Sequence, residues 1–209
     1  MMYLSRLELN PTSRNAMRDI GDVAMLHKRF MMAFPGVSTK TPRKDLGVLF
    51  RIDSVKRLPV ALIQSQVEPD WTFLPAGYCI RPAEFKEIGQ RLERISEGAT
   101  LAFRLRANPS KRIPNEGGNP KRVSLYGQEK QTVWLQRRAT DSGFEPASVN
   151  VIQEGTLKTQ DGKSFESAVF EGALRVVDRE MLIEAIKVGI GPGKAYGFGL
   201  LTLAPYKPG

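Results

Sequence analysis

The chain has 209 residues, and 41% of them are apolar, which is enough for a core in one large or two small domains and too many for a disordered protein. No apolar run approaches the roughly 20 residues of a membrane-spanning helix, and the N-terminus lacks the features of a signal peptide. Cys79 and His27 are the only residues of their kinds, so an internal disulfide and a zinc site of the usual Cys/His type are excluded. We therefore expect a cytoplasmic protein with no metal and no cofactor.

The formal net charge of +9 is concentrated in one part of the chain. Between Phe103 and Arg138 there are nine basic and two acidic residues, a local charge of +7. Concentrated positive charge attracts polyanions, since neutralising phosphates releases their condensed counterions. Nucleic-acid binding is the favoured interpretation; a membrane surface or a merely solvated basic face are the alternatives.

The first half of the chain reads as a mixture of strands and one clear helix. Residues 2–9 alternate as a strand does, and Asp22 is placed to cap a helix with apolar residues at helical spacing. Two further strands and a basic turn follow, then a segment able to hold a fourth strand, then a charged stretch that is helix-prone in part. The expected elements are a strand at 2–9, a helix at 23–33, strands at 46–52, 60–67 and 71–80, and helix within 82–97.

The second half repeats this order. The expected elements are a strand at 100–107, a loop at 108–120, a helix at 128–139, strands at 149–157 and 165–177, a helix at 179–187 and a last strand at 200–203. In the first of these strands Arg104 and Arg106 lie on the face opposite Phe103 and Leu105, so we expect the arginines to be exposed. The pattern predicts an α+β protein of two tandem ferredoxin-like (RRM-like) β-α-β-β-α-β domains, at 1–97 and 98–209.

A glycine-rich segment near the C-terminus is the sharpest local motif. Its glycines are Gly189, Gly191, Gly193, Gly197 and Gly199. It is not a Walker loop, since Ala195 follows Lys194 where Ser or Thr is required, and it is not a Rossmann fingerprint, because it follows a helix. Exposed backbone N–H groups in such a loop can bind phosphate, but a structural turn between helix and strand explains the glycines equally well.

The spacing Gly-apolar-Gly, five residues, Gly-apolar-Gly resembles the C-terminal signature of CRISPR repeat-processing endoribonucleases. Other segments resemble the CasE branch of that family, in the family's order along nearly the whole chain: MYLSRLELNPTSR, FRLRANPSKR, VWLQRR, VFEGALRVVD and GIGPGKAYGFGLLTLAP. The resemblance implies two ferredoxin-like domains, cleavage at the base of a repeat hairpin, and retention of the product RNA in the Cascade complex. The expected partners are the repeat RNA and other Cascade subunits, with a monomer when the protein is alone.

His27 has apolar neighbours at helical spacing, so its position alone indicates a histidine at the edge of the core. The resemblance instead implies that His27 is the catalytic residue of a metal-independent cleavage, in which the 2′-hydroxyl attacks its own phosphate and leaves a 2′,3′-cyclic phosphate. Some family members carry Tyr three residues before this histidine and Lys five residues after it. Here these positions hold Ala24 and Met32, so the assisting residues cannot be transferred, and Lys28 and Lys194 are the candidates that remain.

Recognition of an RNA stem relies on phosphate contacts and shape, because the major groove of A-form RNA is too narrow to read easily. The candidate contacts are Arg104, Arg106, Lys111, Arg112, Lys121, Arg122, Arg137, Arg138, Lys158 and Lys163. Arg137 and Arg138 end a predicted helix, where they would equally complement its dipole. Trp71, Trp134 and Tyr196 are able to stack on bases, but large aromatic residues more often lie in the core.

Three functions are compatible with this sequence. The first is an endoribonuclease with His27 as the proton-transfer residue. The second is a non-catalytic subunit that only holds the repeat hairpin, which the departures at Ala24 and Met32 keep open. The third, a small-molecule enzyme on a ferredoxin-like scaffold, has no cofactor motif to support it.

Overall fold

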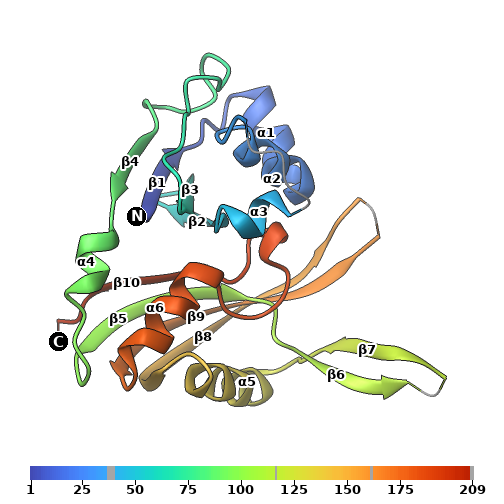
Figure 1. The fold of residues 1–209 in the computed structure, drawn as a ribbon. Helices are drawn as coiled ribbons and strands as arrows, with labels where there is room; N and C mark the ends of the chain where they lie inside the picture. The colour runs from blue at the N-terminus through green and yellow to red at the C-terminus, as the bar shows by residue number, and fades with distance from the viewer. Residues whose placement is uncertain (37–40, 116, 161, 208–209) are drawn as a thin grey trace. The chain divides into compact units, whose positions relative to one another are not determined.

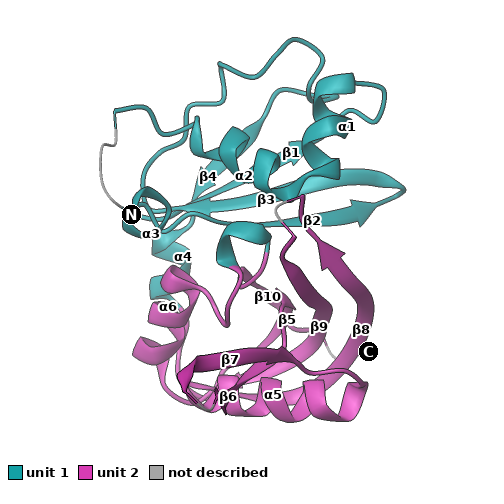
Figure 2. Cartoon of the chain, turned by 90° about the vertical axis from the view of Figure 1, so that its right-hand side faces the viewer, with its two compact units in different colours: residues 1–94, 194–197 teal, residues 95–193, 198–209 magenta. Residues whose placement is uncertain are grey.

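A computed structural model describes residues 1–36, 41–115, 117–160 and 162–207 of the chain. The chain forms two compact units (Figure 2). The first contains residues 1–94 and 194–197, and the second contains residues 95–193 and 198–209. The boundary expected from the sequence lies after residue 97. The structure instead groups residues 95–97 with the second unit and residues 194–197 with the first.

The first unit is built on a four-stranded antiparallel sheet with the order β2-β3-β1-β4 (Figure 1). The strands are β1 (Tyr3–Glu8), β2 (Leu49–Val55), β3 (Leu58–Ser65) and β4 (Glu84–Glu87). The helices are α1 (Arg14–Gly21), α2 (Val23–Met31) and α3 (Pro42–Asp45) between β1 and β2, and α4 (Gly89–Glu93) after β4. This strand order is that of a ferredoxin-like sheet, as the sequence predicted.

The core of this unit joins the helices to the sheet. Leu26 and Phe30 lie one helical turn apart on α2 and are fully buried. The ring of Phe30 meets Phe50 and Trp71 edge to face, with centroids 5.2 and 6.1 Å away. Trp71 is 8% exposed, and its Nε1 donates a hydrogen bond to Ser5 Oγ at 3.0 Å. Trp71 is therefore a core residue and not a platform for bases.

The expected strand at 71–80 was wrong, and two elements of the first unit, β4 and α1, were not expected. Residues 71–80 form turns, with a single bridge between Cys79 and Leu9, since Pro75 and Gly77 interrupt any ladder. The fourth strand is β4, and all four of its residues are exposed, so it shows no apolar pattern. Within 82–97 only α4 is helical. Helix α1 was missed because its buried residues are Ala16 and the charged Asp19.

The second unit has the same sheet topology, with the order β10-β5-β9-β8. The strands are β5 (Thr100–Ala107), β8 (Phe144–Lys158), β9 (Ser164–Val176) and β10 (Leu201–Pro205). The helices are α5 (Gln128–Thr140) between β5 and β8, α6 (Arg179–Val188) after β9, and the short 3-10 helix η1 (Lys194–Tyr196), which groups with the first unit. The order β-α-β-β-α-β is complete here, which confirms the predicted tandem ferredoxin-like fold.

A two-stranded hairpin interrupts this pattern between β5 and α5. The expected loop at 108–120 is instead part of the hairpin of β6 (Ser110–Asn115) and β7 (Gly118–Ser124), which extends beyond α5 (Figure 1). Most of its residues are exposed on both faces, and each strand contains a proline, so neither an apolar alternation nor strand propensity marks it in the sequence.

The core of the second unit contains the second tryptophan. Trp134 of α5 is 5% exposed, and its ring stacks on Phe170 of β9 with centroids 5.9 Å apart. Phe103 and Leu105 of β5 are buried, while Arg104 and Arg106 point to the opposite face of the sheet. The expectation that Trp134 belongs to the core is confirmed.

Candidate active site and nucleic-acid interface

Helix α2 holds His27 at the edge of the core. The helix begins at Asp22, whose Oδ1 accepts a hydrogen bond from the backbone N–H of Ala24 at 3.0 Å. Because Leu26 and Phe30 anchor the inner face of α2, His27 beside them is half-buried. Its imidazole stacks on Phe50 of β2, with ring centroids 6.1 Å apart and 14° between the planes.

The environment of His27 keeps its imidazole uncharged. Burial, and after it the positive charge of Arg43, lower the pKa of His27 to about 4. The Nδ1 atom is buried and has no hydrogen-bond partner within the part of the chain that the structure describes. At neutral pH the side chain is therefore in the form that can accept a proton.

Two half-buried cations lie close to this helix within the first unit. Arg43 belongs to α3, and its Nη1 donates a hydrogen bond to the carbonyl of Val48 at 3.2 Å. Lys194 begins η1, which packs against α2 and β2. Burial lowers the pKa of Lys194, and the charges of Arg43 and Lys44 lower it further. Lys194 was predicted from the sequence as a candidate to assist His27. Its element, η1, lies against the helix that carries His27.

The remaining positions of α2 offer fewer functional groups. Lys28 is exposed. Ala24 is exposed, and Met32, at the C-terminal cap of the helix, is 50% exposed. These two apolar residues provide neither a hydroxyl nor an ammonium group, so any assistance to His27 comes from other positions.

A buried polar cluster fixes the orientation of α2. Asp19 of α1 is fully buried, and its Oδ2 accepts hydrogen bonds from Arg29 Nε at 2.8 Å and from the hydroxyl of Tyr78 at 3.1 Å. The guanidinium of Arg29 also lies over the ring of Tyr78, 5.6 Å from its centroid. This cluster was not evident from the sequence, since its members come from three separate segments and share no periodicity. Arg29 lies two residues after His27, so the cluster ties the helix that carries His27 to α1 and to Tyr78.

In the second unit, the hairpin β6–β7 carries four exposed cations, Lys111, Arg112, Lys121 and Arg122. Arg112 and Arg122 are directly opposite each other in the ladder. Arg122 donates to Ser110 Oγ at 3.1 Å, and burial together with the charges of Arg112 and Arg138 lowers its pKa. Like charges directly across a ladder repel each other, so this arrangement is typical of a surface that meets an anion.

A groove of about 810 Å³ lies beside the hairpin, along α5. Five cations line it, against only Glu129 and Asp141: Lys111, Arg112, Lys130, Arg137 and Arg138. Arg138 forms an ion pair with Asp141 at 3.2 Å and lies over the ring of Trp134, whereas Arg137 is exposed. Lys130 contributes to the local charge of the sequence but was not among the predicted contacts, and only its position in the groove distinguishes it.

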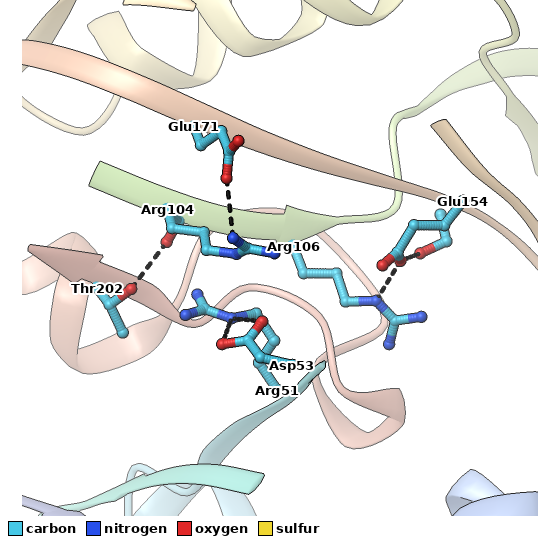
Figure 3. A network of polar contacts seen from close by, with 8 residues as sticks. Arg51, Asp53, Arg104, Arg106, Glu154, Glu171 and Thr202 are labelled. Carbon is cyan, nitrogen blue, oxygen red and sulfur yellow. Dashed lines mark hydrogen bonds and ion pairs between the residues drawn. The ribbon is translucent and has the colours of Figure 1, made fainter. Parts of the chain in front are cut away.

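Arg104 and Arg106 are less available than the sequence predicted. Arg104 pairs with Glu171 at 2.9 Å, and its side chain is 40% exposed. Arg106 pairs with Glu154 at 2.6 Å, lies over the ring of Phe198, and has a side chain only 15% exposed. Figure 3 shows both pairs. The expectation of two exposed arginines is wrong for Arg106, because carboxylates of β8 and β9 occupy the same face of the sheet.

Lys158 and Lys163 are exposed at the end of the β8–β9 hairpin. They carry positive charge at a strand end that projects from the sheet. Their exposure fits an RNA contact and a solvated surface equally well.

The glycine-rich segment is closely packed by aromatic rings. A Cβ at Gly191 would lie 2.9 Å from Cζ2 of Trp134, and a Cβ at Gly193 would lie 2.8 Å from Cδ2 of Phe198. Both residues also have positive φ, of 80° and 83°. Gly189 caps α6 with φ of 82°, and Gly197 and Gly199 have φ of 81° and 91°. Packing and backbone conformation thus account for Gly191 and Gly193 without a bound phosphate.

No group of three or more metal-ligating side chains gathers anywhere in the described ranges. Within those same ranges, no helix has the length and apolar character needed to cross a membrane.

Comparison with known proteins gives one consistent result. Residues 2–205 match a family model described as CRISPR associated protein. The chain is 35% identical to the CRISPR-associated endoribonuclease Cse3 of Thermus thermophilus over 223 residues, and 30% identical to the CRISPR system Cascade subunit CasE of Escherichia coli over 217 residues. Each alignment covers 98% of this chain and 100% of the relative. The structure of Thermus thermophilus Cse3 bound to an RNA representing a pre-cleavage complex superimposes with a TM-score of 0.84, at 35% identity, covering 98% of this chain and 99% of that one.

Proposed function

The chain belongs to the CRISPR-associated protein family, as its resemblance to the CasE branch predicted, and from this premise we propose that it is an endoribonuclease that cleaves CRISPR repeat hairpins without a metal ion. Relatives that match it along nearly their whole length are named as an endoribonuclease and as a Cascade subunit. We propose that it likewise remains bound to its product within Cascade, and that it is a monomer when alone. Its sole thiol, the half-buried Cys79, is compatible with the cytoplasm, where we propose that it acts.

The observation that carries the catalytic proposal is the uncharged imidazole of His27 beside half-buried cations. His27 accepts the proton of the 2′-hydroxyl, and the 2′-oxygen attacks the adjacent phosphorus. The bond from phosphorus to the 5′-oxygen breaks, which leaves a 2′,3′-cyclic phosphate on one product and a 5′-hydroxyl on the other. The 5′-oxygen needs a proton as it leaves, and the ammonium of Lys194 donates it. Because its pKa is lowered, this ammonium is a stronger acid than an ordinary lysine.

The hairpin β6–β7 and the groove along α5 hold the RNA stem in this proposal. Their cations, from Lys111 to Arg138, are directed at phosphates, and such contacts position a duplex without reading its sequence. Lys28 contributes a further exposed charge on α2. Arg104 and Arg106 are weaker candidates, since each already pairs with a carboxylate.

A cleavage assay in excess EDTA tests the proposal. The repeat hairpin encoded beside the gene should be cut as fast as in Mg²⁺, and the products should carry 2′,3′-cyclic phosphate and 5′-hydroxyl ends. Activity that disappears in EDTA, returns with Mg²⁺ or Mn²⁺ and leaves 3′-hydroxyl ends would contradict the mechanism. Tight binding without cleavage in every condition would favour the rival function, a subunit that only holds the hairpin.

A further inference from the structure

Arg43 is a charged residue that the steps above do not use. Its side chain is half-buried, and it donates one hydrogen bond, to the carbonyl of Val48, immediately before β2. Neither Arg43 nor Lys194 forms an ion pair with a carboxylate of the described residues. Two neighbouring cations are thus half withdrawn from water without a counterion among the described residues.

This arrangement is unfavourable in the free protein. Removing a charge from water has an energetic cost that an opposite charge normally offsets, and two like charges close together repel each other. Burial lowers the pKa of Arg43, and the charge of Arg43 lowers the pKa of both His27 and Lys194. A fold that retains such a pair gains from an anion that binds between the two side chains.

The position of Arg43 defines which anion that is. Arg43 of α3 donates to the carbonyl of Val48, two residues before Phe50, and the ring of Phe50 stacks on His27 of α2. Lys194 begins η1, which packs against α2 and β2. The three side chains thus belong to elements that meet around the start of β2. A group held by Arg43 therefore lies within reach of both proton-transfer side chains. When a 2′-hydroxyl attacks the adjacent phosphodiester, that group is the reacting phosphate itself. Its non-bridging oxygens gain negative charge as the fifth bond to phosphorus forms.

We propose that Arg43 is a catalytic residue that binds a non-bridging oxygen of the scissile phosphate and stabilises the charge that develops there. This inference rests on the proposed ribonuclease function and deepens it. Arg43 transfers no proton: the 2′-hydroxyl proton still goes to His27, and the leaving 5′-oxygen still takes its proton from Lys194. The guanidinium is suited to this role because it stays charged and presents several donors in one plane. Its hydrogen bond to Val48 uses one of these donors and leaves the others free to face the phosphate.

The test uses the full chain and the repeat hairpin encoded beside the gene, with one non-bridging oxygen of the scissile phosphate replaced by sulfur in each of its two stereochemical forms. Single-turnover cleavage is measured with saturating protein for the wild type, for Arg43→Ala, for Arg43→Lys and for a control, Arg91→Ala, which removes an exposed arginine of α4. Affinity is measured in parallel on a hairpin with a 2′-deoxy nucleotide at the cut.

The wild type and Arg91→Ala should cut one sulfur form much more slowly than the oxygen substrate, since sulfur accepts hydrogen bonds poorly. Arg43→Ala should cut the oxygen substrate at least about a hundredfold more slowly and lose this stereospecific difference, with affinity within a few-fold of the wild type. Arg43→Lys, which keeps the charge and is the variant to rely on if Arg43→Ala does not fold, should fall between the two.

Two results would overturn the role proposed for Arg43. If Arg43→Ala cuts at nearly the wild-type rate, or slows while the sulfur effect stays intact, Arg43 does not contact the phosphate, although the wild-type activity still supports the ribonuclease. If the wild type itself leaves the hairpin uncut, both proposals fall together.

Discussion

The imidazole of His27 and the ring of Phe50 lie nearly parallel, with 14° between their planes and their centroids 6.1 Å apart. The stacking places a titratable group against a fully buried aromatic residue of β2. Water is thereby kept from one side of the imidazole, which is why burial is the main cause of its lowered pKa. The contact keeps His27 unprotonated at neutral pH, so that it is free to act as a base. It also means that protonating His27 destabilises the folded state.

This gives a prediction for stability in acid. The unfolded chain protonates His27 near its ordinary pKa of 6.5, whereas the folded protein does so only near 4. Between these values the unfolded state binds more protons, so the free energy of unfolding falls as the pH drops. The contribution is on the order of 1–3 kcal/mol once solvent screening of a half-buried group is allowed for.

Urea unfolding at about pH 7 and about pH 4.5 measures this contribution. The wild type should lose more stability between the two conditions than His27→Gln, which has no imidazole to protonate. Other titrating groups act on both proteins equally, so the difference isolates His27. Equal losses would mean that His27 is well solvated and that its pKa is ordinary.

A second prediction separates chemistry from binding. His27→Ala should abolish cleavage of the repeat hairpin and leave its affinity within a few-fold of the wild type, because affinity depends on many phosphate contacts in the other unit. Cleavage rates and filter binding on the same preparation check this, with a thermal melt to show that the variant is folded. Normal cutting by His27→Ala would make His27 a packing residue and remove the catalytic assignment.

The sequence predicted the elements whose buried faces are apolar. Strand β5 alternates regularly, and α2 and α5 carry apolar residues at helical spacing, so all three were expected close to their observed bounds. The missed elements bury little. Helix α1 turns Ala16 and the charged Asp19 inward, β4 is wholly exposed, and the β6–β7 hairpin is solvated on both sides. No periodic apolar signal exists for such segments.

Some residues of the candidate site could likewise be predicted from the sequence, and others could not. His27 stands out because it is the only histidine and because its helix resembles that of a known family. Arg43 gives no such signal, since α3 is a four-residue helix with no buried residue, and the hydrogen bond of Arg43 to Val48 is evident only in the folded unit. The pairing of Arg106 with Glu154 was equally invisible, as the two residues lie on different strands of the sheet.

A third prediction concerns the packing of the glycine-rich segment. Gly191→Ala places a methyl group 2.9 Å from Trp134 at a positive φ, so it should destabilise the protein by about 2–4 kcal/mol through overpacking and backbone strain. Gly98→Ala is the matched control: its φ is also positive, at 79°, but a Cβ there meets nothing within 4 Å. Chemical denaturation of both variants gives the two losses. If Gly98→Ala is as destabilising as Gly191→Ala, the contact with Trp134 contributes little and φ alone explains the glycine.

The last prediction concerns the basic hairpin. Lys111 and Arg112 are exposed on β6 and line the groove along α5. Each phosphate contact that is lost should reduce the slope of log affinity against log salt by about one, so Lys111→Ala with Arg112→Ala should weaken binding of the repeat hairpin and flatten the slope by up to about two. The melting temperature should barely change, because exposed charges contribute little to folding. Lys86→Ala with Arg91→Ala, two exposed positions in the first unit, removes the same charge and should leave the slope nearly unchanged. If the hairpin variant binds with the wild-type affinity and slope, β6 presents a solvated face or meets another Cascade subunit, and Lys158 and Lys163 at the end of the β8–β9 hairpin become the next positions to test.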